Sequence, residues 1–167
     1  MTGTAIIHST AWFSFALWAG AEEALVRRHN HRARRFWTWG AAVLALHIAA
    51  AFQWQHHWSH SAAVRATAEQ TASVIGWPWG GGVWINYALL TVWSVDALRW
   101  WSRNGNEKTS APHIALRCVL AFLWFQAAVV FAHGGIRAIA GLVFLGLAVR
   151  ISLSRKPPSV KNSGTAP

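Results

Sequence analysis

The sequence predicts an all-α, polytopic membrane protein: a five-transmembrane-helix bundle with an additional amphipathic surface helix. Three observations lead to this fold class. Of the 167 residues, 54% are apolar and only 12% are charged, which is about half the charged fraction usual for soluble domains. Five apolar stretches of 18 to 22 residues follow one another, and a membrane-spanning helix needs roughly 20 residues. Basic residues gather in alternate connections, as expected of a chain that crosses repeatedly.

The five apolar stretches are the predicted transmembrane helices. Backbone groups in hydrocarbon must satisfy their own hydrogen bonds, and the stretches are too long for strands and do not alternate as strands do, so helices are expected. Their bounds are 5–26, 36–54, 82–101, 114–133 and 136–153. We assign residues 1–154 to one membrane domain and predict a disordered tail over 155–167. A single cysteine rules out a disulfide framework.

The distribution of Lys and Arg predicts the orientation. Twelve basic residues fall on one side of the predicted membrane and two, Arg65 and Arg137, on the other. Short basic loops stay in the cytoplasm, so we expect the N-terminus outside and the C-terminus in the cytoplasm. Ala19-Gly20-Ala21 is similar to a signal-peptidase site, but no positive charge precedes the apolar run, so we expect the first helix to be retained.

The longest connection, residues 55–81, is predicted to lie outside and to contain a surface helix. Residues 61–75 are rich in Ala and free of Pro and Gly, which favours a helix, and its mixed polar and apolar sequence is suited to the membrane surface. Gly76-Trp77-Pro78 predicts its end. Trp residues at the predicted boundaries, such as Trp39 and Trp101 inside and Trp58 outside, agree with an aromatic belt.

Histidines converge on the predicted outer face from three chain segments. His56 and His60 are four residues apart, and His57 and His60 three, so a helix would place their rings on one side. Imidazole is a common ligand of Zn, Cu and Fe, which predicts a metal or haem site. The candidate ligands are His56, His57, His60, His8, His133 and Glu69. The alternative is that these rings only occupy the headgroup region, where half-polar side chains are common.

A second set of ionisable residues is predicted at one depth near the inner face. It comprises Glu22, Glu23, Asp96 and Arg117. Charges inside a membrane are costly and should pair or line a wet cavity. We expect Asp96 to pair with Arg117, with Arg99 as the local alternative, and Glu22 or Glu23 to pair with Arg27 or Arg28. The set is interpreted either as a proton or ion pathway or as structural pairs that fix helix packing. Deeper still, we expect Gln126 to hydrogen-bond His47.

Three classes of function remain. The first is a non-enzymatic or accessory membrane component, alone as a homo-oligomer or in a larger complex. The second is a metal- or haem-binding redox protein, and the third is a small transporter or proton pathway. The basic stretch 27–35 is interpreted as a topology determinant in contact with anionic lipid, not as a nucleic-acid site. High Arg, Ala and Trp content with only three Lys suggests a GC-rich bacterial genome and hence the inner (plasma) membrane.

Overall fold

The computed structural model describes residues 3–103, 110–130 and 134–154, and its regular elements in those ranges are all helical. In chain order the helices are α1 (Gly3–Val26), α2 (Asn30–Trp54), α3 (His60–Ile75), α4 (Gly82–Ser102), α5 (Ala111–Phe125) with a π-helical turn (Gln126–Val130), and α6 (Gly135–Ser154). The predicted all-α class is therefore confirmed. The predicted tail lies outside the described residues.

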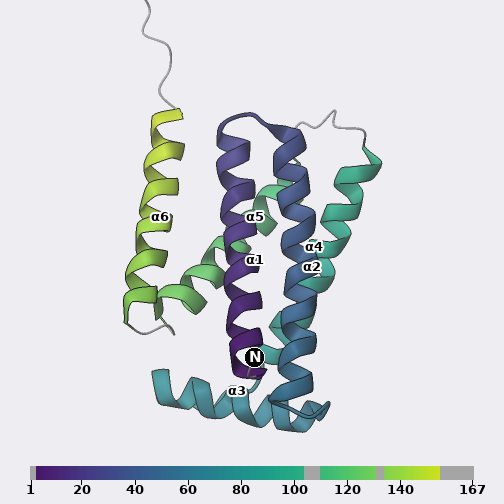
Figure 1. The fold of residues 1–167 in the computed structure, drawn as a ribbon, viewed down its shortest axis with the longest axis vertical. Helices are drawn as coiled ribbons and strands as arrows, with labels where there is room; N and C mark the ends of the chain where they lie inside the picture. Colours follow the sequence, from purple (N-terminus) through teal and green to yellow (C-terminus); the bar gives the residue numbers. More distant parts are fainter. Residues whose placement is uncertain (1–2, 104–109, 131–133, 155–167) are drawn as a thin grey trace, which may run out of the picture.

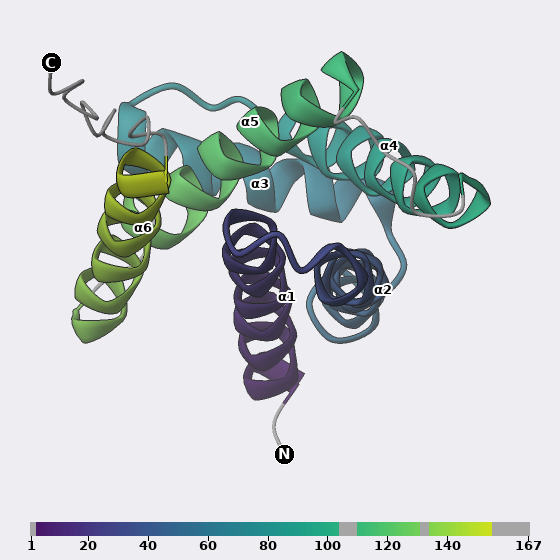
Figure 2. The same cartoon turned by 90° about the horizontal axis from the view of Figure 1, so that it is seen from above.

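The helices form a bundle with one helix lying across its end. α1 and α2 pack side by side as an antiparallel pair, α4 packs on α2, and α6 lies on the other side of α1 (Figure 1). Seen from above, α4, α5 and α6 form an arc beside the α1–α2 pair (Figure 2). α3 runs across the end of the bundle that also holds the N-terminus. We call this the α3 end, and the opposite end, where Arg27, Arg28, Arg103 and Arg150 lie, the basic end.

Three helices are long and apolar enough to span a membrane: Asn30–Trp54, Ala111–Val129 and Arg137–Ser154. This supports a membrane protein but not, by itself, five crossings. α1 and α4 have 24 and 21 residues, so they have the length. They fall short in mean hydropathy because their sequences include several Trp, Ser and Thr residues, with His8 in α1 and Asp96 in α4.

The connection between α1 and α2 is much shorter than predicted. The sequence suggested a nine-residue basic loop, but α2 begins at Asn30, and so Arg32, Arg34 and Arg35 lie on its first two turns. Arg and Ala are good helix formers, which explains the extension. α1 ends in a Schellman motif: the N–H of His29 donates to the Ala24 carbonyl at 2.8 Å, and that of Arg28 to the Leu25 carbonyl at 3.0 Å.

α3 begins at His60, one residue before the predicted start, and ends at Ile75, where Gly76-Trp77-Pro78 predicted its end. Ser59 caps α3, its hydroxyl accepting from the N–H of Ala62 at 3.2 Å. Gly76 ends the helix with φ of 77°, a left-handed conformation that suits glycine. Gly134, with φ of 64°, is also left-handed and directly precedes α6.

The core is built on tryptophan and lies between α1, α2 and α4. Trp18, Trp37 and Trp93 are at most 2% exposed. Gly40 lets the Trp93 ring reach α2, since a Cβ at that position would lie 2.8 Å from Trp93 Cζ2. α6 contributes far less, and Ala140 is the single buried residue among its described side chains. The tightly packed half of the molecule is therefore the half that contains α1 and α2.

Candidate functional site

Two buried ionisable side chains, Glu22 and His113, lie near the basic end, where α1, α2, α4 and α5 meet, together with half-buried Asp96 and Arg117 and the buried Trp37 ring. We call this set the inner polar cluster. Its members are Glu22, Trp37, Asp96, His113 and Arg117. Glu22 and His113 are 5% and 6% exposed. Buried polar groups must be bonded to be tolerated, so the partners of each member decide what the cluster can do.

Asp96 holds two ring N–H groups from two other helices. Its Oδ2 accepts from Trp37 Nε1 of α2 at 2.9 Å and from His113 Nδ1 of α5 at 2.8 Å. The His113 ring lies between the rings of Trp37 and Trp100, with centroids 5.1 and 5.0 Å away. A neutral His113 that donates from Nδ1 keeps Nε2 as an acceptor. Asp96 therefore both joins three helices and fixes the orientation of one imidazole.

Glu22 and Arg117 form a buried ion pair between α1 and α5. Arg117 Nε donates to the two carboxylate oxygens at 2.9 and 3.2 Å, and Nη2 donates to Oε2 as well. A forked contact of this kind is among the strongest side-chain pairings. Nearby Glu23 is more exposed and bonds Arg27 at 2.6 Å and Arg150 at 3.4 Å. Of the predicted pairings of Glu22 or Glu23 with Arg27 or Arg28, the structure therefore contains Glu23 with Arg27, whereas Glu22 bonds Arg117.

The predicted pairing of Asp96 with Arg117 is wrong. Glu22, Asp96 and Arg117 do lie near the same end of the bundle, but this shared level does not fix the side of α5 that faces each neighbour. His113 and Arg117 are one helical turn apart and divide their partners: His113 bonds α4, and Arg117 bonds α1. His113 was not among the predicted inner ionisable residues, although its four-residue spacing from Arg117 marks a shared polar face.

A cavity of about 250 Å³ opens beside Asp96 and His113. Its other lining residues are Arg99, Trp100, Arg103, Ser110 and Pro112. Two of the cluster members are thus next to open volume, whereas the Glu22–Arg117 pair does not line it. Asp96 and His113 are therefore reachable from this cavity, and Glu22 and Arg117 are not among its lining residues.

Among the described residues, the predicted outer histidines are not grouped so that they could hold a metal ion. His60 Nδ1 lies 3.2 Å from the Tyr87 hydroxyl, and its ring packs on Trp84 at 4.9 Å. His56 packs on Phe52 at 5.7 Å. Partial burial, and then the neighbouring His57, lower the pKa of His56. Its imidazole is therefore neutral at pH 7 and packs as a neutral ring.

No three His, Cys, Asp or Glu side chains of the described ranges are grouped so that they could hold a metal ion. His8 and Glu69 are described, and neither joins such a group. His133 lies outside those ranges, so the part of the metal or haem hypothesis that uses it stays a prediction. In the same half of the molecule, His47 Nδ1 contacts the Ile7 carbonyl at 3.0 Å and Thr10 at 3.4 Å. The predicted bond to Gln126 is therefore wrong, because this face of α2 packs on α1.

No family model, no curated protein and no solved structure matches the chain. Its function is therefore inferred from its own residues.

Proposed function

We propose that the protein is a non-enzymatic, five-crossing membrane component whose inner polar cluster fastens its helices together. The observation that carries the proposal is that buried ionisable groups bond to one another across helices: Glu22 to Arg117, and Asp96 to His113. Ionisable groups in a membrane interior pair in this way when they stabilise packing. The chain would act as an accessory subunit in a homo-oligomer or a larger complex.

Two features support five crossings. α1 packs antiparallel along α2, which is a candidate span. Because the two helices have nearly equal lengths, a membrane that surrounds α2 would also surround α1. Arg27, Arg32, Arg103 and Arg150 lie at the basic end, whereas Arg65 of α3 lies at the other (Figure 1). Under the positive-inside rule the basic end is cytoplasmic, with the N-terminus outside. The protein belongs, on this proposal, to a bacterial inner membrane.

The open side of α6 supports assembly with another membrane helix. Five of its large apolar side chains are exposed: Ile139, Leu142, Leu145, Val149 and Leu153. A Cβ added at Gly141 or Gly146 would meet nothing within 4 Å. Small residues of this kind let a second helix approach closely in a membrane, so α6 is the helix expected to contact a partner or a second copy.

Single-cysteine labelling tests the five crossings. In a Cys118→Ser background, Thr4→Cys, Ser73→Cys and Ser102→Cys place one thiol in the first turn of α1, on α3 and at the end of α4. With five crossings, an impermeant maleimide labels positions 4 and 73 from outside and position 102 only after permeabilisation. If α1 does not cross, position 4 is on the side opposite to 73; if α4 does not cross, position 102 is on the same side as 73. Either result overturns the proposal.

A proton pathway is the second candidate, favoured by the cavity beside Asp96 and His113. The two functions separate in proteoliposomes that contain a pH-sensitive dye. The accessory role predicts no proton flux above that of empty liposomes. A flux that is lost in Asp96→Asn and kept in the surface control Glu69→Gln supports a pathway instead and overturns the non-enzymatic, purely structural role.

A further inference from the structure

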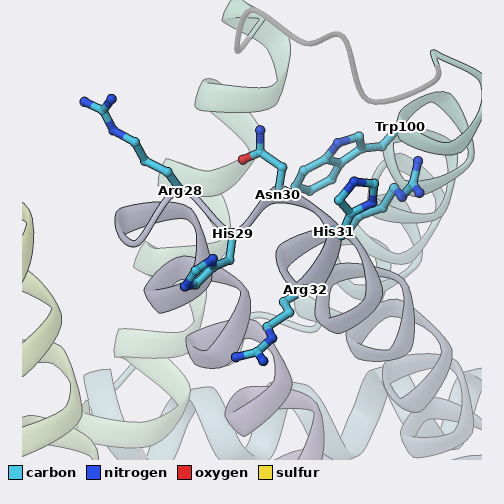
Figure 3. Close-up of a pocket in the computed structure, with 7 residues that line it drawn as sticks. Arg28, His29, Asn30, His31, Arg32 and Trp100 are labelled. Atoms are coloured by element: carbon cyan, nitrogen blue, oxygen red, sulfur yellow. The ribbon is translucent and has the colours of Figure 1, made fainter.

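A basic hollow of about 410 Å³ lies at the turn between α1 and α2. Its lining residues are Arg28, His29, Asn30, His31, Arg32, Arg34 and Trp100. Asn30, His31 and Trp100 lie together, while Arg28 and Arg32 extend on either side of the turn (Figure 3). Trp100 is 4% exposed, so its ring is held by the core and forms a fixed wall.

The positive charge of the hollow is not neutralised by the described carboxylates. No acidic side chain is among its lining residues. The three described carboxylates nearest the basic end are engaged elsewhere: Glu22 by Arg117, Glu23 by Arg27 and Arg150, and Asp96 by Trp37 and His113. A concave surface of one sign of charge concentrates ions of the other sign, so the hollow is built for an anion.

Arg34 adds a positioned guanidinium. Its Cζ stacks over the Trp101 ring, 3.9 Å from the centroid, and its Nε is buried without a hydrogen-bond partner among the described residues. A buried donor without a partner is unfavourable. Arg34 also lines the hollow, and its planar guanidinium suits the oxygens of a phosphate.

The backbone of the turn points to the same ligand. Arg28 has φ of 60° and occupies the left-handed position of the Schellman motif, where glycine is the usual residue. The chain thus keeps a guanidinium at a place where its backbone conformation disfavours any side chain. His29, the capping residue of α2, contributes no side-chain bond to the first turn, and the N–H groups of a helix start attract anions.

We propose that this hollow binds the phosphate of an anionic phospholipid headgroup. The hollow sits at the first turn of α2, a candidate span, and hence at the level of the headgroups. Juxtamembrane basic side chains attract anionic lipid, and the neighbouring Trp101 is half exposed, as expected of a ring at the interface. The lipid proposal requires only that α2 spans the membrane. It does not require α1 or α4 to span it, so it would still hold if the five-crossing topology were wrong.

Lipid titration of the full chain in detergent tests the proposal. Short-chain phosphatidylglycerol and phosphatidylcholine are titrated separately, and bound lipid is counted by native mass spectrometry. We expect phosphatidylglycerol to bind at least tenfold more tightly. Arg28→Gly, which suits the left-handed backbone and so preserves folding, should weaken it about fivefold, as should Arg32→Gln. Arg65→Gln, at the α3 end, is the matched control and should change nothing.

Equal affinity for the two lipids would overturn the proposal, as would full binding by Arg28→Gly and Arg32→Gln together in a chain of unchanged helicity. A third arm adds inorganic phosphate. Displacement of phosphatidylglycerol at millimolar phosphate with constant ionic strength would make a free phosphate the ligand and overturn the lipid assignment. Failure to displace it supports the lipid.

Discussion

The two ends of the bundle use their polar side chains in different ways. At the basic end, Glu22 and His113 are buried and reach across to other helices through charged partners. At the α3 end, His56 and His60 contact mainly aromatic rings, and His60 bonds one exposed hydroxyl. The sequence draws attention to the α3 end because its histidines are numerous. The connected groups lie at the other end, because a network depends on burial and facing helix surfaces and not on the number of residues.

The largest effect is expected from breaking the Glu22–Arg117 pair. Glu22→Gln leaves a largely buried guanidinium without its counter-charge, and removal of one partner of such a pair costs about 3–5 kcal/mol. The free energy of unfolding, measured by SDS titration in mixed micelles, should fall by this amount. Glu23→Gln is the matched control, since the exposed Glu23–Arg27 pair should contribute only about 0.3–0.5 kcal/mol.

The double variant Glu22→Gln, Arg117→Met sharpens this result. With both charges removed, most of the lost stability should return, because apolar replacement of a buried ion pair is often neutral. Equal losses in Glu22→Gln and Glu23→Gln would mean that Arg117 escapes to water and that the Glu22–Arg117 pair contributes no more than an exposed pair.

Asp96→Ala is the next largest expected effect. The substitution leaves Trp37 Nε1 and His113 Nδ1 without their acceptor, and each buried, unsatisfied donor costs about 1–3 kcal/mol. Asp96→Asn keeps one acceptor oxygen and should lose less. The same SDS titration measures both variants. If Asp96→Asn and Asp96→Ala are equally stable to within error, the carboxylate is not the bond that joins α2, α4 and α5.

Much of the fold follows from local features of the sequence. The length of an apolar stretch and the sign of its flanking charges are properties of neighbouring residues, so the helices, the surface helix with its Ser59 and Gly76 caps, and the basic end are all predictable. The prediction of a nine-residue loop over residues 27–35 was wrong. Its charged residues were taken to mark a connection between helices, although Arg32 and Arg34 favour a helix as strongly as many apolar residues do.

The partners in the inner polar cluster were not predictable in the same way. Asp96, Arg117 and Glu22 share a depth, but a pair also requires that two helices turn the right faces toward each other. The orientation of α5 about its own axis directs His113 toward Asp96 of α4 and Arg117 toward Glu22 of α1. This rotation is set by packing of Trp18, Trp37 and Leu120 in the core, and long-range packing leaves no local signal in the sequence.

Glycine at the two left-handed turns gives a smaller and opposite effect. His57 and Arg28 both have positive φ, 48° and 60°, so His57→Gly should raise the free energy of unfolding by about 0.5–1 kcal/mol as backbone strain is relieved. Arg28→Gly should do the same, but lose the affinity for anionic lipid. If His57→Gly instead lowers stability, its imidazole makes a contact that the α3 end is not expected to contain.

The smallest effect is expected from the His60–Tyr87 contact. His60 is exposed and Tyr87 is half-buried, and the 3.2 Å bond between them competes with water, so Tyr87→Phe should change the free energy of unfolding by less than about 0.5 kcal/mol. His60→Ala should cost slightly more, because it also removes the ring that packs on Trp84. Both are measured in the same titration as Glu22→Gln. A loss in Tyr87→Phe comparable to that in Asp96→Ala would mean that the α3 end, like the basic end, is held by a polar bond, and the histidines there would have to be reconsidered as a connected site.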